Sequence, residues 1–436
     1  MPARPTRLPP TLPHVSTAPA GAPIVARTVA LPDPGPLLGH LPDDEPLAWV
    51  RRGEGIVAWG ECLRVEVGGA GRFAEAGRAW RSLTDHAVVR DEVDLPGTGP
   101  VAFASFAFAD GSPAGGVLVV PRTVLGHRDG RWWLTSISAD GALPGHEGLP
   151  DPDPVRAPGV VTYADGARSG PQWVTAVSDA VARIAAGDVD KVVMARDLEA
   201  RTSGPVDARW LLARLAERYP SCWTFAVDGL VGATPEMLVR RERGLVTSRV
   251  LAGTIQRTGD DDHDLALAAS LARSSKDLEE HEYAVRSVAE ALHPYCSGTN
   301  VPESPFVLHL PNVMHLATDV TGVLADRAGA EPPSVLDLAA ALHPTAAVCG
   351  TPTGPAAALI SELEGMDRDR YAGPVGWLDA RGDGEFGIAL RCARIDRGDP
   401  SRLRLFAGCG IVAGSDPESE LAESDAKLVP MRDALG

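Results

Sequence analysis

The sequence predicts an α/β fold with sheets that are largely antiparallel or mixed. Several short apolar runs follow one another directly, and the tight turns that join them favour antiparallel pairing. Other segments have apolar residues at helical spacing, and they alternate with further strands in the C-terminal part. A chain of 436 residues has room for about two to four domains or for one large domain.

The N-terminal third predicts a tail followed by short strands. Residues 1–23 are rich in proline and are expected to be unordered. Short strands joined by turns follow, and the runs 117–120 and 132–137 flank Asp129-Gly130, a strong hairpin signal. Residues 138–159 contain five prolines, which makes them the best candidate for a linker.

The C-terminal part alternates between helices and strands. Ser169-Gly170-Pro171 begins a helix that ends at Gly187, and a long helical region over 261–293 stops at Pro294. Ser334, Gly354 and Pro417 are further expected helix starts. The remaining expected elements are a helix over 206–219 and strands over 191–196, 223–227, 230–233, 237–241, 245–250, 306–310, 314–324, 375–379, 386–395 and 403–412.

Composition excludes several functions. Forty-one Lys and Arg against 58 Asp and Glu give a net charge of −17, which argues against nucleic acid or an anionic membrane as a partner. No apolar run reaches the ~18 residues of a membrane span. Six scattered cysteines without a CxxC pair indicate reduced thiols and a cytoplasmic protein. The sequence has no Walker A motif and no strand-coupled GxGxxG, which argues against a nucleotide enzyme.

Lys191 and Glu236 are candidates for acid–base chemistry. Lys191 opens an apolar strand and shares a face with Val193, so lost hydration would lower its pKa and allow it to act as a base. Glu236 follows Gly-Ala-Thr-Pro between two strands, where partial burial would make it a general acid. Spacing alone favours the alternatives, a lysine that snorkels to water and a solvated glutamate in a turn.

Glutamates on two helices suggest a magnesium site. Glu280 lies on an apolar helical stripe, while Glu420, Glu423 and Lys427 share one face of the last helix. Carboxylates from two helices, together with an anionic substrate, suit Mg²⁺. A surface ion pair between Glu423 and Lys427 explains the same spacing equally well, and such a pair contributes only ~0.3–0.5 kcal/mol.

Arg391 and two glycine segments could hold an anionic ligand. Arg391 lies within the expected strand 386–395 among small residues, so its guanidinium could grip a carboxylate, although an ion pair with a nearby acid is the alternative. Gly253-Thr254 and Gly408-Cys409-Gly410 stand at strand ends, where glycine lets backbone N–H groups approach an anion. His315 and His343 lack the spacing of zinc ligands.

Nine sequence blocks in order resemble the chorismate-utilising enzymes, and the isochorismate synthases most closely. The resemblance covers about residues 165–430, and it implies one large domain over 24–436 with two packed, mainly antiparallel sheets and helices outside. Residues 24–160 are its less recognisable part, and 138–159 then becomes a surface loop. The blocks are KVVMAR (191–196), GATPEML (232–238), LAGT (251–254), SSKDLEEHEYAV (274–285), HLATDVTG (315–322), LHPTAAVCGTP (342–352), YAGPVGWLD (371–379), IALRCARI (388–395) and AGCGIVAGSDPESELAESDAKL (407–428).

The resemblance also implies roles for individual residues. Lys191 matches the base that activates water for attack at C2 of chorismate, and Glu236 matches the acid that protonates the departing C4 hydroxyl. Glu280 and Glu423 match ligands of Mg²⁺. The other implied site residues are Asp277 and Glu420 near the ion, Arg391, Tyr371, Gly408, Cys409 and Gly410 at the enolpyruvyl carboxylate, Gly253 and Thr254 in the substrate loop, and Lys427 and His315 in the pocket wall.

Three positions distinguish the reactions of these enzymes. Aminating members usually carry Gln in place of Lys191, and some carry a nucleophilic Lys in place of Ala252. Salicylate synthases usually carry Thr in place of Ala347. The resemblance therefore implies a Mg²⁺-dependent isochorismate synthase without a glutaminase subunit, either monomeric or dimeric, that serves menaquinone or siderophore biosynthesis.

Three alternatives stay open at this point. A salicylate synthase would go on to eliminate pyruvate, and an anthranilate or aminodeoxychorismate synthase component would use ammonia. An inactive relative would bind chorismate without converting it.

Overall fold

The computed structural model describes residues 14–16, 22–145, 148–151, 153–326, 329 and 331–436. Most of the tail that was expected to be unordered lies outside these residues. The described part of that tail, His14–Ser16, forms strand β1 and pairs antiparallel with β4. No helix in the described part of the chain is both long enough and apolar enough to span a membrane.

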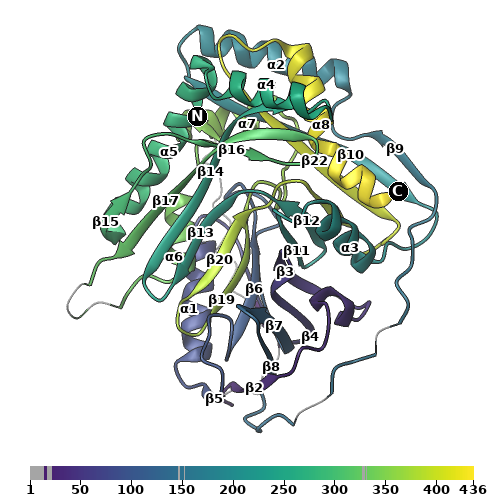
Figure 1. Cartoon of the computed structure of the whole chain (residues 1–436), viewed down its shortest axis with the longest axis vertical. Coiled ribbons are helices and arrows are strands. Elements are labelled where there is room, and N and C mark those ends of the chain that lie inside the picture. The colour runs from purple at the N-terminus through teal and green to yellow at the C-terminus, as the bar shows by residue number, and fades with distance from the viewer. Residues whose placement is uncertain (1–13, 17–21, 146–147, 152, 327–328, 330) are drawn as a thin grey trace, which may run out of the picture.

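The described strands form one hydrogen-bonded network of 22 strands that divides into two arms (Figure 1). Long strands β4 (Glu54–Val67) and β7 (Gly116–Arg128) pair with each other and start one arm each. The first arm continues from β4 through β3 (Leu47–Arg51), β11 (Trp223–Val227), β12 (Leu230–Thr234), β21 (Cys392–Ile395), β22 (Arg402–Ile411) and β10 (Lys191–Thr202). The second continues from β7 through β6 (Val101–Phe106), β19 (Pro374–Asp379), β20 (Gly384–Ile388), β13 (Met237–Glu242), β14 (Leu245–Gln256) and β17 (Val313–Leu324).

Shorter strands extend this network at its edges. All pairings are antiparallel except the one between β2 and β5, as the sequence of adjacent strands predicted. The hairpin at Asp129-Gly130 joins β7 to β8, and both turn residues have positive φ. The edge strands are β2 (Val25–Leu31), β5 (Val88–Asp91), β8 (Arg131–Ser138), β9 (Val161–Asp165), β15 (Cys296–Asn300), β16 (Phe306–His309) and β18 (Gly350–Thr351).

The two arms pack against each other, so the expectation of two packed antiparallel sheets is confirmed. Trp49 of the first arm donates its indole N–H to Glu385 of the second over 2.8 Å. A Cβ atom on Gly387 would lie 2.9 Å from the Trp49 ring, so the arms are in close contact there. The segment 24–160 supplies strands to both arms, so the described strands on either side of 138–159 belong to one fold rather than to two domains.

Two short passages of the chain between the arms each carry a predicted site residue. Pro235 and Glu236 carry the chain from β12 to β13, and residues 389–391 carry it from β20 to β21. The Ile388 N–H donates to the Glu236 carbonyl over 3.1 Å, so the crossings touch. The expected continuous strand 386–395 is therefore wrong: Arg391 lies outside both strands with φ of 48°, because a chain that changes sheets must break its ladder.

Several helices begin at the positions that their capping residues predicted. Ser169 begins α2 (Gly170–Ala185) with a capping box, and Ser334 does the same for α6 (Val335–Leu342). Asp416 accepts from the Ser419 N–H over 2.9 Å and begins α8 (Pro417–Leu435). α3 (Ala208–Arg218) and α7 (Thr353–Leu363) also lie near their expected positions. Short 3₁₀ helices cover Leu37–His40 and His293–Tyr295.

Two helix predictions were wrong for local reasons. The region 261–293 is two helices, α4 (Asp261–Leu271) and α5 (Ser275–Leu292), because the Ser274 hydroxyl accepts from the Asp277 N–H over 3.3 Å and begins a new helix. Helix α1 (Arg72–Thr84) was not anticipated among the N-terminal strands. Its N-cap is Gly71, which has no side chain to cap with, so the usual start signal is absent.

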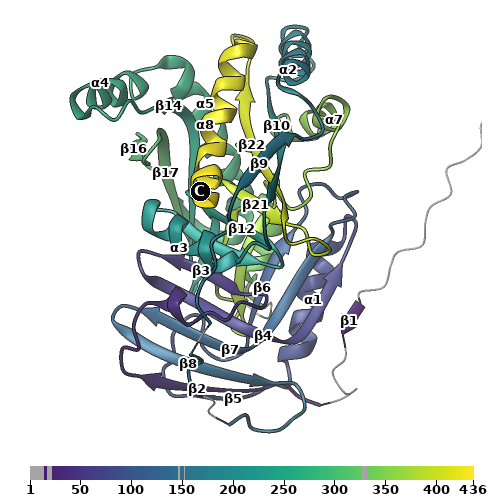
Figure 2. The ribbon, with the colours of Figure 1, turned by 90° about the vertical axis from the view of Figure 1, so that its right-hand side faces the viewer.

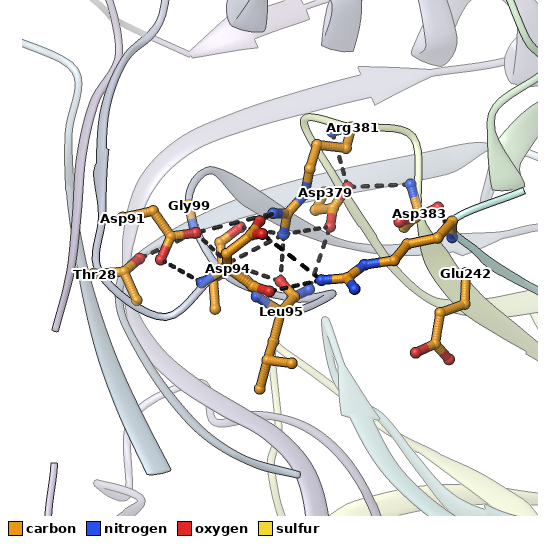
Figure 3. A network of polar contacts seen from close by, with 12 residues as sticks. Thr28, Asp91, Asp94, Leu95, Gly99, Glu242, Asp379, Arg381 and Asp383 are labelled. Carbon is orange, nitrogen blue, oxygen red and sulfur yellow. Dashed lines mark hydrogen bonds and ion pairs between the residues drawn. The ribbon is translucent and has the colours of Figure 1, made fainter. Parts of the chain in front are cut away.

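A buried carboxyl group ties the N-terminal part to the β19–β20 hairpin (Figure 3). Asp379 is 0% exposed and accepts the backbone N–H groups of Gly97, Arg381 and Asp383 over 3.2, 2.8 and 3.1 Å. Arg381 in turn contacts Asp94 over 2.9 Å. Burial raises the pKa of Asp379 to about 6. The loop that contains Asp94 and Gly97 is thus held to the β19–β20 hairpin, although nearly 300 residues separate the two in sequence.

Candidate active site

A cavity of about 160 Å³ contains every site residue that the sequence predicted. Its walls come from both arms and from helices α5 and α8, which lie beside β14 and β22 (Figure 2). The predicted residues that line it are Lys191, Glu236, Gly253, Thr254, Asp277, Glu280, His315, Ala347, Tyr371, Arg391, Gly408, Cys409, Gly410, Glu420, Glu423 and Lys427.

Lys191 is a buried group at the start of β10. It is 4% exposed, and its Nζ lies 2.6 Å from Oε1 of Glu280 on α5. The alternative of a lysine that snorkels to water therefore does not apply. A Cβ atom on Gly410 of the neighbouring strand β22 would lie 2.8 Å from the Glu280 oxygen and 3.0 Å from Cε of Lys191. Glycine at this position leaves the space that the ion pair occupies.

Glu236 is a buried acid rather than a solvated turn residue. It is 4% exposed, and its own N–H donates to the Thr234 hydroxyl over 3.2 Å. Burial raises the pKa of Glu236 to about 7, although the Leu251 backbone and the cations Lys191, Arg391 and Lys427 act in the opposite direction. A carboxyl group with this pKa holds a proton at neutral pH that it can donate to a leaving group.

His315 orients Arg391 at the second crossing. The Arg391 Nη2 donates to Nε2 of His315 over 3.2 Å, so this nitrogen is an acceptor and the proton is on Nδ1. Nδ1 lies 3.0 Å from the Thr254 hydroxyl. Burial, with the charges of Arg391 and Lys427, lowers the pKa of His315 well below its usual range. A neutral imidazole therefore bridges the guanidinium of Arg391 and the hydroxyl of Thr254.

Arg391 alone among the buried arginines of the described chain has no acidic partner. Six others each form an ion pair, namely Arg72, Arg196, Arg209, Arg241, Arg368 and Arg370. Arg391 is 7% exposed, its Nε has no hydrogen-bond partner, and burial lowers the pKa of its guanidinium. The alternative of a protein ion pair is thereby excluded within the described residues. A buried, uncompensated guanidinium at a cavity wall is suited to an anionic ligand.

Helix α8 brings a second lysine–glutamate pair to the cavity. Lys427 Nζ lies 2.6 Å from Oε1 of Glu423, and it donates to the Gly408 carbonyl over 2.9 Å. The pair that the spacing predicted therefore forms, but it lines the cavity instead of lying on a solvated face. Glu420 on the same helix is 8% exposed, and the Cys409 thiol donates to its backbone carbonyl over 3.5 Å.

Glycines shape the remaining walls. Gly253 has φ of 77° in a bulge of β14, and a Cβ atom there would lie 3.1 Å from Cβ of Asp277. A Cβ atom on Gly408 would lie 3.1 Å from the Tyr371 Oη. Tyr371 is stacked on Phe406 with ring centroids 5.2 Å apart, and burial raises its pKa. These positions accept only glycine without a shift of the wall.

The donor chemistry of the cavity fits Mg²⁺. Besides Glu236, four carboxylic acids line it, two from α5 and two from α8, and hard oxygen ligands are the ones this ion prefers. In the described residues no three potential ligand side chains are gathered into a preformed metal cluster. Glu280 and Glu423 instead form ion pairs with Lys191 and Lys427, so a bound ion would replace these lysines as the positive partner of the two glutamates.

Eight lining residues were not predicted as site residues. Arg368 is the charged one, and it forms a buried ion pair with Glu364 one helical turn earlier in the sequence. Their i, i+4 spacing was the available signal, but the same spacing is typical of exposed pairs. The others are Val193, Pro235, Leu251, Ala252, Val348, Ala372 and Leu390.

A buried acid with a pKa near neutrality, a lysine and an arginine without an ion pair in the described residues share one cavity, which is the arrangement expected of an enzyme that acts on a small anion by acid–base chemistry. Residues 154–436 match the family model described as "Chorismate binding enzyme", and the chain belongs to this family. The geometry and the family assignment therefore agree on the class of ligand.

Named relatives point in the same direction. The salicylate biosynthesis isochorismate synthase of Pseudomonas aeruginosa is 35% identical over 89% of this chain and 84% of its own length. Isochorismate synthase DhbC of Bacillus subtilis is 42% identical over 60% of this chain and 66% of its own length. The crystal structure of a putative 2,3-dihydroxybenzoate-specific isochorismate synthase from Bacillus anthracis has a TM-score of 0.75 and 33% identity, covering 92% of this chain and 98% of that one.

Proposed function

We propose that the chain is an isochorismate synthase that interconverts chorismate and isochorismate. The observation that carries the proposal is the shared cavity of Lys191, Glu236 and the unpaired Arg391. Chorismate is a dianion, so a cavity lined by five acidic residues would repel it without local positive charge. Arg391 supplies that charge at one end, and within the described residues it forms no ion pair with a carboxylate.

The reaction moves two protons, and the cavity has a group for each. Lys191 takes a proton from the water whose oxygen bonds to C2, the ring double bond shifts, and the C4–O bond breaks. Glu236 gives its proton to the departing C4 hydroxyl, which leaves as water. The reverse reaction uses the two groups in exchanged roles, so the interconversion is freely reversible.

We also propose that the enzyme depends on Mg²⁺. Glu280 and Glu423 would hold the ion, with Asp277 and Glu420 close by, and the ion supplies positive charge for a substrate carboxylate when it is bound. In the structure Glu280 and Glu423 form ion pairs with Lys191 and Lys427, so these two lysines stand where the ion would supply positive charge.

One incubation tests the function. The purified chain, chorismate and Mg²⁺ are combined, and the products are separated by chromatography. Isochorismate is expected. Salicylate with pyruvate would indicate a salicylate synthase, an ammonia-dependent aminated product would indicate the aminating branch, and unchanged chorismate with folded protein would indicate a binding protein.

Ala347 favours isochorismate as the final product. It lines the cavity in the position where salicylate synthases usually carry Thr, and a hydroxyl there would add a hydrogen-bonding group to the wall. Pyruvate elimination is therefore not expected, and pyruvate should stay at background in the incubation.

Lys191→Ala tests the assignment of the base. The variant is expected to lose turnover while it still binds chorismate, because Arg391 and the metal ligands are retained. Binding is measured by chorismate-induced thermal stabilisation of the variant. Turnover at the unaltered rate would remove Lys191 from the mechanism.

The proposed function also bears on the compartment and on the pathway that the enzyme serves. All six cysteines are free thiols, which supports a reducing, cytoplasmic location. Isochorismate serves both menaquinone and siderophore biosynthesis, and the solved structures similar to this chain include a menaquinone-specific and a putative 2,3-dihydroxybenzoate-specific isochorismate synthase. The predicted monomer or dimer without a glutaminase subunit can be checked by light scattering.

A further inference from the structure

Strand β10, which carries Lys191, lacks a continuous neighbour on one of its edges. Strand β22 pairs with it along 192–201 on one side. On the other side β18 pairs only with Lys191 and Val192, and β9 pairs only with residues 198–202. Within the described chain, residues 193–197 have no strand partner on that edge.

Other groups satisfy the backbone along this gap, and an ion pair supplies two of them. The Val193 N–H donates to the Cys349 carbonyl over 2.8 Å, and the Ala195 carbonyl accepts from the Trp173 indole over 3.1 Å. Glu364 Oε1 accepts the Ala195 N–H over 2.7 Å. Arg368 Nη2 donates to the Val193 carbonyl over 2.6 Å. A carboxylate and a guanidinium thus pair with the strand as a neighbouring backbone would.

The same ion pair also holds the wall that carries Ala347. Arg368 Nη1 donates to the Val348 carbonyl over 2.9 Å, and its Nε donates to Glu364 Oε2 over 2.9 Å. Nη2 also donates to Glu364 Oε1, so four of the five guanidinium N–H groups are used within the protein. The side chains are 1% and 2% exposed.

Burial of this kind is not explained by stability alone. Removing two charges from water is costly, and well-packed apolar residues are often as stable as a buried ion pair. The planar guanidinium of arginine has several donors in fixed positions, so it can hold two separate backbone segments at set distances. Apolar residues cannot do this.

We propose that Glu364 and Arg368 are positioning residues that fix the Lys191 end of β10 against the cavity wall at 345–349. The inference rests on the proposed function, because it concerns the placement of the proposed base. Lys191 lies two residues from the carbonyl that Arg368 holds, so release of Val193 and Ala195 would let its amine move relative to the substrate.

The test compares two buried ion pairs of similar build. Glu364→Gln removes the charge from the pair at β10. Asp207→Asn does the same to the pair with Arg209, whose side chains are 3% and 2% exposed and which also joins backbone groups but does not line the cavity. For both variants the thermal unfolding midpoint, kcat, KM for chorismate and the pH profile of kcat/KM are measured.

Glu364→Gln is expected to lower kcat by ~10²-fold, the loss that a misplacement near 1 Å produces, with KM nearly unchanged. The alkaline limb of its pH profile is expected to have the same midpoint as in the unaltered chain, because the substitution does not change Glu236. Asp207→Asn is expected to lose a similar degree of thermal stability while kcat is retained. Equal kcat in the two variants, or a rise in KM with kcat retained, would overturn the inference.

Arg368→Lys keeps the test decisive if Glu364→Gln does not fold. It retains the charge, but one ammonium group cannot reach both the Val193 and Val348 carbonyls. A reduced kcat with unchanged KM supports positioning, and full kcat refutes it. If the unaltered chain produces no isochorismate, the proposed function fails first, which separates the two hypotheses.

Discussion

Replacement of Glu236 by glutamine tests the central electrostatic feature of the site. The side chain is 4% exposed, and burial raises its pKa from 4.5 to about 7 despite three nearby cations. Glutamine preserves the size of the group but removes the proton that it could donate. The substitution therefore affects the reaction and the stability in opposite directions.

The pKa sets the magnitude of both effects. With a pKa of about 7, the protonated fraction of Glu236 falls from roughly nine-tenths at pH 6 to roughly one-tenth at pH 8. Loss of a general acid typically lowers the rate by ~10²–10⁴-fold. The raised pKa gives a stability contribution that is fully present below the unfolded value of 4.5 and is lost as pH rises through about 7. At pH 8 the lost free energy of unfolding is on the order of 3 kcal/mol.

The assay measures kcat/KM for chorismate from pH 5.5 to 9, since this ratio reports the free enzyme. The unaltered chain should lose activity by ~tenfold per pH unit above about 7, and Glu236→Gln should have low activity without this limb. Chemical unfolding of the variant should show a gain in stability at pH 8 and none at pH 4. A flat profile for the unaltered chain to pH 9, or no gain in stability at pH 8, would refute the assignment of a buried acid.

Three further predictions follow from the cavity walls. Gly410→Ala should reduce kcat/KM by ~10–100-fold, because the new methyl group would lie 2.8 Å from the Glu280 carboxylate. Gly414→Ala is the control and should be neutral in the same assay, because Gly414 is exposed and a Cβ atom there would have no atom within 4 Å. Arg391→Lys should reduce kcat/KM for chorismate by ~10–100-fold, because an ammonium lacks the planar fork, and equal kinetics would argue against a carboxylate contact. Chelation of Mg²⁺ should abolish turnover, and added Mg²⁺ should restore it. In a titration, the variants Glu280→Gln and Glu423→Gln should need a higher Mg²⁺ concentration for the same activity. Full activity in the presence of the chelator would remove the metal from the proposal.

Local signals in the sequence predicted much of the fold. Adjacent apolar runs and the Asp129-Gly130 turn gave strands and antiparallel pairing, because these depend on neighbouring residues. Capping residues such as Ser169 and Asp416 placed helix starts correctly. The break at Ser274 was not anticipated, because it lies within a continuous apolar pattern. The helix after Gly71 was not anticipated either, because it has no side-chain cap.

The two crossings show where local pattern fails. Residues 386–395 have the composition of one strand, yet the chain leaves one arm after Ile388 and joins the other at Cys392. Which arm a segment joins depends on partners that lie more than a hundred residues away in sequence. That information is not contained in the segment itself, so the positive φ of Arg391 could not be foreseen.

The sequence by itself determined the chemical groups of the site: a lysine, a glutamic acid, an arginine and four further acids in an order that matches a known family. Only the tertiary structure decided what those groups are able to do. Burial at the crossing raises the pKa of Glu236, packing leaves Arg391 without an ion-pair partner in the described residues, and a glycine on β22 makes room for Lys191 beside Glu280. Proton affinity and charge pairing depend on solvent and on neighbours in space, and both are set when distant segments pack together.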